Sequence, residues 1–283
     1  MYEKILVPLD GSPLAEAALP GAEELAGRLG SEIILLSISE STEAEEYLKY
    51  QIYIECKVEE IRKHARKYLD KSTGKDITVT PVVVVGHPAE EVIRYANRKA
   101  IDIIVMTTHG SSGIKRWALG RMADKVVRAT DRPVALIRAR TPYSDIARKS
   151  ITRKALVSLD GSEASEAVIP FIQEFAKRLQ TQVTLIQVVP RSYRVFADAE
   201  SYMEKVREHF QSKGITTNSI VRMGAAAEEI IKIADEIKTD IVAMSTHGRS
   251  GIGRWSIGSV ADKVLRGGNT PVLLVKTPGN ATG

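Results

Sequence analysis

Two glycine-rich loops in this sequence have the composition of an anion-binding site. One runs from His109 to Gly120 and the other from His247 to Gly258, and each leads directly into a predicted helix. Glycine lets the backbone turn closely around a bound group, and the first turn of a helix presents N–H groups and the positive end of the helix dipole. The two loops therefore predict binding of phosphate.

The residue that follows each loop differs between the two copies. The second loop ends in Gly258-Ser259, whose hydroxyl can bind a phosphate oxygen or cap the helix. The first ends in Gly120-Arg121, which puts a long cation at the same position. Arg121 could pair with a phosphate or fill the pocket, so the two sites are expected to differ.

An Asp-Gly-Ser turn follows the first apolar run in each half of the chain. It stands as Asp10-Gly11-Ser12 and again as Asp160-Gly161-Ser162. A carboxylate at a strand end can accept a hydrogen bond from an adenine amino group or a ribose hydroxyl, and the glycine frees the backbone to turn. The same three residues also suit a plain turn, and both interpretations stay open here.

These motifs belong to an internal repeat. Lys4 to Ser12 returns as Lys154 to Ser162, an offset of 150 residues, and the glycine-rich loop returns with an offset of 138. From His109 to Arg138 against His247 to Lys276, 16 of 30 positions are identical. Solenoid units of roughly 20 to 47 residues cannot fold singly. Copies of this length predict a duplicated domain instead.

Short apolar runs alternate with helical patterns in each copy. The runs are rich in Ile and Val on consecutive positions, which is typical of parallel strands buried on both faces. In the first copy they cover residues 4–9, 32–38, 77–85, 102–107 and 133–138, and in the second copy 154–159, 182–189, 216–223, 240–245 and 271–276. Helices are predicted between them, near residues 13–29, 43–69, 89–100 and 121–129 of the first copy, with Ser12 as a helix cap before Pro13.

This alternation predicts an α/β fold with two tandem doubly wound domains, each with a five-stranded parallel sheet. We place the first domain at residues 1–141, a linker at 142–152, the second domain at 153–278 and a tail at 279–283. The first copy holds 12 extra residues between its second and third strands, which we expect to lengthen a helix around Tyr47, Tyr50, Ile54, Val58 and Ile61. In open sheets of this kind, ligands bind outside the carboxyl ends of the strands.

With these motifs in place, the chain resembles a tandem universal stress protein over nearly its whole length. Nucleotide-binding members of that family carry Gly-x-x-Gly, nine residues, then Gly and Ser or Thr. The second copy matches from Ser245 through Gly248 to Gly258-Ser259, and departs only at the leading glycine. The first copy has Thr107 and Arg121 at two of the motif positions, and departs twice.

The resemblance implies a 3-2-1-4-5 sheet of the adenine nucleotide alpha hydrolase-like type and binding of ATP, with Mg²⁺ but no fixed protein-bound metal site. The adenosine would lie at the ends of the first, second and fourth strands, and the triphosphate over the glycine-rich loop. The implied second-domain residues are Ser158, Leu159, Asp160, Val188, Met244, Ser245, His247, Gly248, Arg249, Gly258, Ser259 and Val260. The first-domain residues are Pro8, Leu9, Asp10, Ile38, Met106, Thr107, Gly110, Gly120 and Arg121.

Composition narrows the possible partners. The 283 residues are 43% hydrophobic and carry a net charge of +5 spread over many residues, so we expect no nucleic-acid partner. No apolar stretch approaches the roughly 18 residues that cross a bilayer, which predicts a protein without membrane contact. The single cysteine, Cys56, fits a reducing cytoplasm.

We therefore expect a cytoplasmic, adenine-nucleotide-binding stress-response protein in which the second domain binds ATP and the first binds weakly or not at all. Family dimers form near the last strand, which implies an internal pseudo-dimer and a homo-oligomer, with a protein partner not identified by the sequence. One alternative is a slow ATP hydrolase, although the sequence has no G-x-x-x-x-G-K-[ST] loop. A second alternative is a signalling or structural dimer that binds no nucleotide. His109 and His247 each lack a carboxylate at metal-ligand spacing, which favours a structural role.

Overall fold

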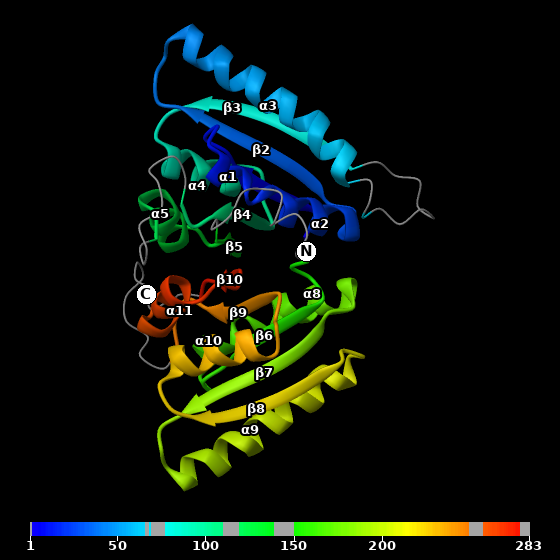
Figure 1. Ribbon diagram of the computed structural model, residues 1–283, viewed down its shortest axis with the longest axis vertical. Helices are drawn as coiled ribbons and strands as arrows, with labels where there is room; N and C mark the ends of the chain where they lie inside the picture. The colour runs from blue at the N-terminus through cyan, green and yellow to red at the C-terminus, as the bar shows by residue number, and fades with distance from the viewer. Residues whose placement is uncertain are drawn as a thin grey trace. The chain divides into compact units, whose positions relative to one another are not determined.

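The computed structural model describes residues 2–65, 68, 77–109, 119–138, 150–248 and 257–277. The chain divides into two compact units, Met1–Ser150 and Ile151–Gly283. Figure 1 labels their helices and strands. Each unit is an α/β domain whose paired strands run parallel. The predicted fold class is confirmed.

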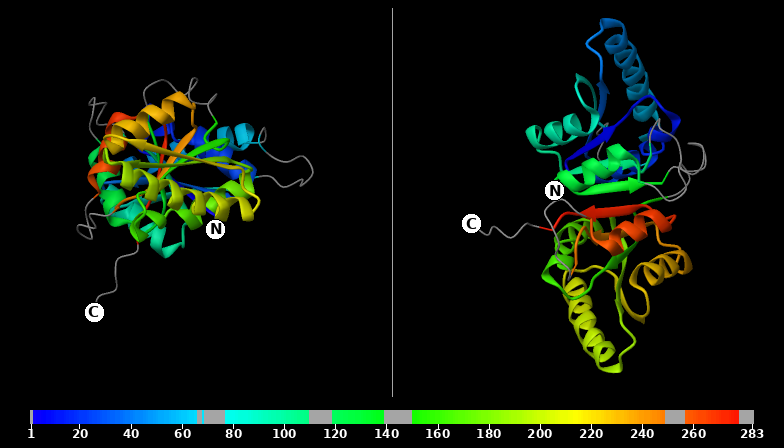
Figure 2. Two further views of the ribbon diagram at one scale, coloured as in Figure 1. Left: turned by 90° about the horizontal axis from the view of Figure 1, so that it is seen from below. Right: turned by 90° about the vertical axis from the view of Figure 1, so that its left-hand side faces the viewer.

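The first unit has strand order β3-β2-β1-β4-β5, as the resemblance implied. Its strands are β1 (Lys4–Pro8), β2 (Glu32–Ser39), β3 (Val79–Val85), β4 (Ile103–Thr107) and β5 (Val134–Ile137). Its helices are α1 (Pro13–Glu16), α2 (Leu19–Leu29), α3 (Ala44–Ala65), α4 (Pro88–Arg98) and α5 (Arg121–Ala129). Helices α2 and α3 pack together and contact the sheet, and α4 packs on α5, so that helices cover the sheet in the views of Figure 2.

The second unit repeats this order as β8-β7-β6-β9-β10. Its strands are β6 (Lys154–Ser158), β7 (Gln182–Val189), β8 (Thr217–Met223), β9 (Ile241–Ser245) and β10 (Val272–Val275). Its helices are α7 (Glu163–Glu166), α8 (Ile169–Leu179), α9 (Tyr193–Ser212), α10 (Ala226–Glu236) and α11 (Ser259–Gly267). The predicted strands therefore differ from the observed ones only at their ends.

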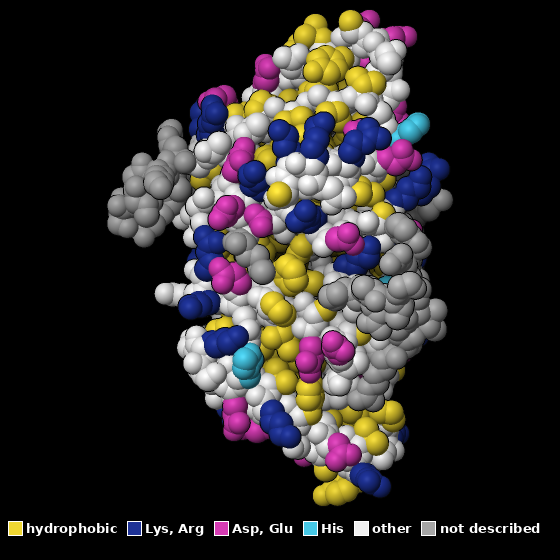
Figure 3. Space-filling model, turned by 180° about the vertical axis from the view of Figure 1, so that it is seen from behind, with side chains coloured by type: hydrophobic (Ala, Val, Ile, Leu, Met, Phe, Trp, Pro, Cys, Tyr) yellow, Lys and Arg dark blue, Asp and Glu magenta, His cyan; other side chains and the backbone are white. Residues whose placement is uncertain are grey.

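The central strands are buried on both faces. Successive residues of β1, namely Ile5, Leu6 and Val7, are fully buried, although neighbouring side chains on a strand point to opposite faces. This double burial is the physical reason for consecutive apolar residues in the sequence. On the face drawn in Figure 3, Lys and Arg side chains are interspersed with Asp and Glu, in keeping with the small net charge.

Two sequence predictions about helices need correction. The predicted helix over residues 13–29 is two helices, α1 and α2, with Ser12 capping α1 through a hydrogen bond from the Ala15 N–H to its Oγ (3.2 Å). The 12 extra residues do not mainly lengthen α3, which has 22 residues where α9 has 20. Most of the insertion falls between Ala65 and Val79, largely outside the described residues.

In each unit the first strand lies between the second and the fourth. Strand β1 pairs with β2 on one side and with β4 on the other, and β6 pairs likewise with β7 and β9. At this reversal of strand order the loops leave toward opposite faces of the sheet, which opens a crevice at the carboxyl ends. The glycine-rich loops and the Asp-Gly-Ser turns all begin at this edge.

Candidate functional site

The second unit has a cavity of about 260 Å³ at the carboxyl ends of β6, β7 and β9. Eleven of the twelve predicted second-domain residues line it: Ser158, Leu159, Asp160, Val188, Met244, Ser245, His247, Gly248, Gly258, Ser259 and Val260. Arg249, the twelfth, lies outside the described residues. The volume of this cavity lies just below the range of roughly 300–1,000 Å³ that is typical of small-ligand pockets.

Asp160 is fixed by the turn in which it lies. Its Oδ1 accepts hydrogen bonds from the Ser162 N–H (2.9 Å) and the Ser162 hydroxyl (2.5 Å). Gly161 between them has φ +79°, a left-handed conformation that favours glycine. Asp10 is held by Ser12 in the same way, at 3.0 and 2.6 Å. The turn interpretation of the Asp-Gly-Ser motif is therefore confirmed, and each aspartate also lines a cavity, so recognition of a nucleoside by its carboxylate stays a prediction.

Gly248 approaches the Asp160 carboxylate closely. A Cβ atom added to Gly248 would lie 2.1 Å from Oδ2 of Asp160. No side chain can occupy that space while the aspartate keeps its position. The glycine at the start of the loop is therefore required by contact with the first strand's turn.

The end of the second loop is tied back to its beginning. The Gly258 N–H donates to the Thr246 carbonyl (2.8 Å), and a Cβ on Gly258 would lie 3.0 Å from that oxygen. Helix α11 then starts at Ser259, so the N–H groups of its first turn have no partner within the helix. They lie at the cavity with the positive end of the helix dipole, which is suited to phosphate.

The hydroxyl residues that replace the motif's leading glycine have a structural role. Thr107 Oγ1 donates to the His109 carbonyl (2.6 Å), and Ser245 Oγ donates to the His247 carbonyl. The ring of His247 also contacts the Thr246 hydroxyl through Nδ1 (3.1 Å). Among the described residues, no group of three or more His, Cys, Asp and Glu side chains could hold a metal ion.

The first unit has a larger cavity, of about 420 Å³, at the corresponding strand ends. It is lined by all the predicted first-domain residues that the structure describes: Pro8, Leu9, Asp10, Ile38, Met106, Thr107, Gly120 and Arg121. Gly110 lies outside the described residues. Arg121 is exposed and lines this cavity without filling it.

Sequence reasoning missed several residues around the two cavities. Thr246, Ser165, Ala226, Ile230 and Ala261 complete the second. Glu40, Glu46 and Tyr50 line the first, together with Ala15, Pro88, Thr108, His109, Met122 and Ala123. Glu40 follows directly on β2, so the rule that ligands meet strand ends could have identified it. Glu46 and Tyr50 carry no such signal, because their place depends on how α3 packs.

The comparisons with known proteins agree with this architecture. The sequence model described as the universal stress protein family matches residues 1–138 and again residues 152–276. This chain belongs to the universal stress protein family. The predicted resemblance is confirmed, and the two matches fit a tandem of universal stress protein domains.

Known universal stress proteins match either the whole chain or one half of it. Universal stress protein Slr1230 of Synechocystis sp. is 22% identical over 306 residues, covering 96% of this chain and 99% of its own. Universal stress protein YxiE of Bacillus subtilis is 29% identical over 148 residues, covering 49% of this chain and all of its own length. A crystal structure of a universal stress protein from Archaeoglobus fulgidus has a TM-score of 0.72 at 19% identity, covers 98% of this chain and 99% of its own, and supports the fold.

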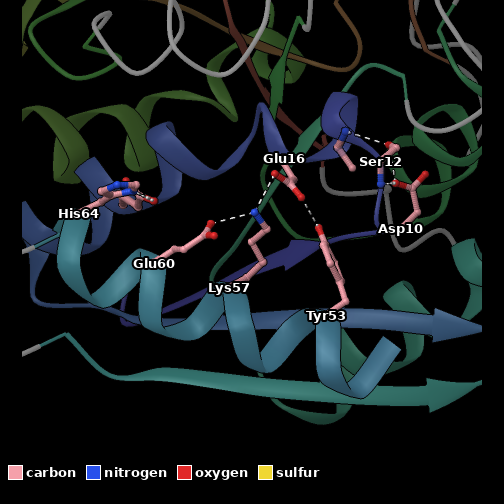
Figure 4. A network of polar contacts seen from close by, with 9 residues as sticks. Asp10, Ser12, Glu16, Tyr53, Lys57, Glu60 and His64 are labelled. Carbon is pink, nitrogen blue, oxygen red and sulfur yellow. Dashed lines mark hydrogen bonds and ion pairs between the residues drawn. The ribbon is translucent and has the colours of Figure 1, made fainter. Parts of the chain in front are cut away.

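A polar network beside each universal stress protein cavity ties the helix after the second strand to the turn after the first. The Tyr53 hydroxyl donates to Glu16 of α1 (2.9 Å), and Lys57 pairs with the same carboxylate (3.0 Å) and with Glu60 (2.8 Å), as Figure 4 shows. In the second unit the Tyr202 hydroxyl donates to Glu166 of α7 (2.7 Å). The two tyrosines therefore fix α3 and α9 relative to the Asp-Gly-Ser turns.

We expect these tyrosines to make the fold sensitive to alkaline pH. Burial and the adjacent glutamates raise the pKa of Tyr53 and of Tyr202 well above the ordinary 10.0. The unfolded chain loses these protons above pH 10 while the folded chain keeps them, so stability falls as pH rises above 10. In urea unfolding, Tyr202→Phe should lower the free energy of unfolding by about 1 kcal/mol at pH 7 and by less at pH 11. An equal loss at both pH values would contradict this prediction.

Proposed function

We propose that this universal stress protein is a nucleotide-binding module whose second domain binds ATP. The observation that carries the proposal is the joint position of eleven predicted residues around one cavity, closed on one side by the first turn of α11. Solved universal stress proteins in complex with cAMP and with dAMP show such ligands in other members of the family.

Each part of ATP has a matching region in the cavity. Leu159, Val188 and Met244 offer apolar contact to the adenosine, and the Asp160 carboxylate can accept from its amino or hydroxyl groups. The phosphates would lie over Gly248, Gly258 and Ser259, where the N–H groups of α11 begin. Mg²⁺ would accompany the phosphates, held by them and by water.

The first domain is proposed to bind ATP weakly or not at all. Arg121 stands where Ser259 offers a hydroxyl, and the surrounding first cavity also has a different charge. We assign no catalytic residue and propose binding without rapid turnover. A steady-state assay that found fast ATP consumption would favour the hydrolase alternative.

We propose a cytoplasmic protein whose nucleotide state changes its association with a protein partner or with another copy of the chain. In the part of the chain that the structure describes, every helix is too short or too polar to cross a lipid bilayer. Pairing through the last strands, both as an internal pseudo-dimer and as a homo-oligomer, stays a prediction.

The direct test is to denature freshly purified protein and quantify the released adenine nucleotide by chromatography and mass spectrometry. We expect about one ATP or related adenylate per chain, or one after titration with ATP and Mg²⁺. Two per chain would show that Arg121 is tolerated. A value of zero after titration would contradict the proposal and favour a duplicated scaffold that acts through protein partners.

A further inference from the structure

The first cavity has an acidic wall that is made by Glu40, Glu46 and Tyr50. Glu40 directly follows β2, and Glu46 and Tyr50 lie in the first two turns of α3, one helical turn apart. All three line the cavity together with Asp10. The first cavity thus brings three carboxylates and one phenol together, and burial and the charges of Glu46, Asp10 and Glu40 raise the pKa of Tyr50.

The second cavity has no counterpart to this wall. When α3 and α9 are aligned on Tyr53 and Tyr202, Val195 is equivalent to Glu46 and Ala199 to Tyr50. When β2 and β7 are aligned, Pro190 is equivalent to Glu40. None of the three lines the second cavity. The two domains therefore share the strand ends and differ in charge at one side of the cavity.

The charges of the first cavity are arranged across the strand order. The acidic wall lies on the side of β2 and α3, and Arg121 lies at the start of α5 after β4. Since β1 separates β2 from β4, Asp10 lies between them. A ligand that fits this pattern has N–H donors at one end and an anion at the other.

The wall is held in place by the network described above. Tyr53, three residues after Tyr50 on α3, is tied to Glu16 of α1 together with Lys57 (Figure 4). Ile54, directly after Tyr53, is buried. The part of the acidic wall that α3 supplies, Glu46 and Tyr50, thus lies on an anchored helix.

Nucleobases differ in how they satisfy a carboxylate. Guanine offers N1–H and the 2-amino group side by side, which one carboxylate can accept with both oxygens. Adenine has no N1–H and offers only its 6-amino group. A carboxylate that loses water when a ligand binds, and gains no hydrogen-bond donor in return, weakens the binding of that ligand. A base without matching donors therefore binds more weakly.

We propose that the first-domain cavity binds a guanine nucleotide, with Glu40 and Glu46 recognising the N1–H and 2-amino donors of the base and Arg121 pairing with the phosphate. Tyr50 provides an aromatic face for the base. The orientation, base toward β2 and phosphate toward α5, rests on the proposed function of the second domain. The chain would then bind two different purine nucleotides, one in each domain.

The test is isothermal titration of the full chain carrying Ser259→Arg, which removes the proposed ATP site. GMP, IMP and AMP are the probes, because IMP keeps N1–H and lacks the 2-amino group. We expect one GMP per chain, roughly tenfold weaker binding of IMP and still weaker binding of AMP. Glu40→Gln together with Glu46→Gln should remove at least tenfold of the preference for GMP over AMP, whereas Glu45→Gln, next to the wall but not lining the cavity, should preserve it.

Equal affinity for GMP and AMP, no binding of GMP, or an unchanged preference in the double variant would each overturn the proposal. The wild-type chain is titrated with ATP and Mg²⁺ in parallel. If the wild-type chain binds no ATP while GMP still binds, only the assignment of ATP to the second domain is contradicted. One ATP bound with no GMP would contradict the guanine site alone.

Discussion

Ser259→Arg is expected to reduce ATP binding by this universal stress protein from about one per chain to nearly none. The substitution removes a hydroxyl at the first residue of α11 and places a long side chain at the mouth of a cavity of about 260 Å³. The first cavity has an arginine at the same position but is larger, about 420 Å³, so the second cavity has less space for such a side chain beside a ligand. An affinity loss of at least tenfold, or about 1.4 kcal/mol, should appear in isothermal titration with ATP and Mg²⁺.

Two variants control for charge and position. Asn269→Arg adds the same charge at an exposed site beyond the end of α11 that does not line the cavity, and should bind ATP as the wild type does. Arg121→Ser changes the corresponding position of the first domain and should leave the second site unchanged. If Ser259→Arg keeps the wild-type stoichiometry and affinity, α11 does not hold the phosphates.

The second large effect is expected for Gly248→Ala. Its Cβ would lie 2.1 Å from Oδ2 of Asp160, so the carboxylate has to move. That movement breaks its hydrogen bonds to Ser162, the residue that caps α7 through the Ser165 N–H (3.1 Å). We expect a loss of roughly 1–3 kcal/mol in the free energy of unfolding, as for other overpacked sites, and at least tenfold weaker ATP binding.

A double variant separates crowding from other effects of the substitution. Asp160→Ala removes the atom that clashes, so Asp160→Ala with Gly248→Ala should be less destabilised than the sum of the two single variants. Gly267→Ala serves as the control, since its Cβ would meet only the flexible end of Ile231 (2.9 Å). Strictly additive losses in urea unfolding would show that the close approach of Gly248 to Asp160 is not what requires the glycine.

The α/β class, the duplication and the edge at which candidate residues gather could all be predicted from the sequence. Consecutive apolar residues such as Ile5, Leu6 and Val7 indicate strands buried on both faces, and the repeated Asp-Gly-Ser turn marks two copies. Parallel strands place all their carboxyl ends at one edge, so residues such as Asp160 and Met244, 84 positions apart, could be assigned to one place before any contact was known.

The residues that complete each cavity, and the volume of each cavity, depend on how the helices and strands pack together. Glu46 and Tyr50 read as parts of an ordinary amphipathic helix, and they line the first cavity because α3 packs on β2 and is tied to α1 by Tyr53. The contact of Gly248 with Asp160 joins two loops that the sequence separates by 88 positions. Local periodicity specifies which face of an element is buried. The distances between side chains on different elements follow from how those elements pack, which no local pattern encodes.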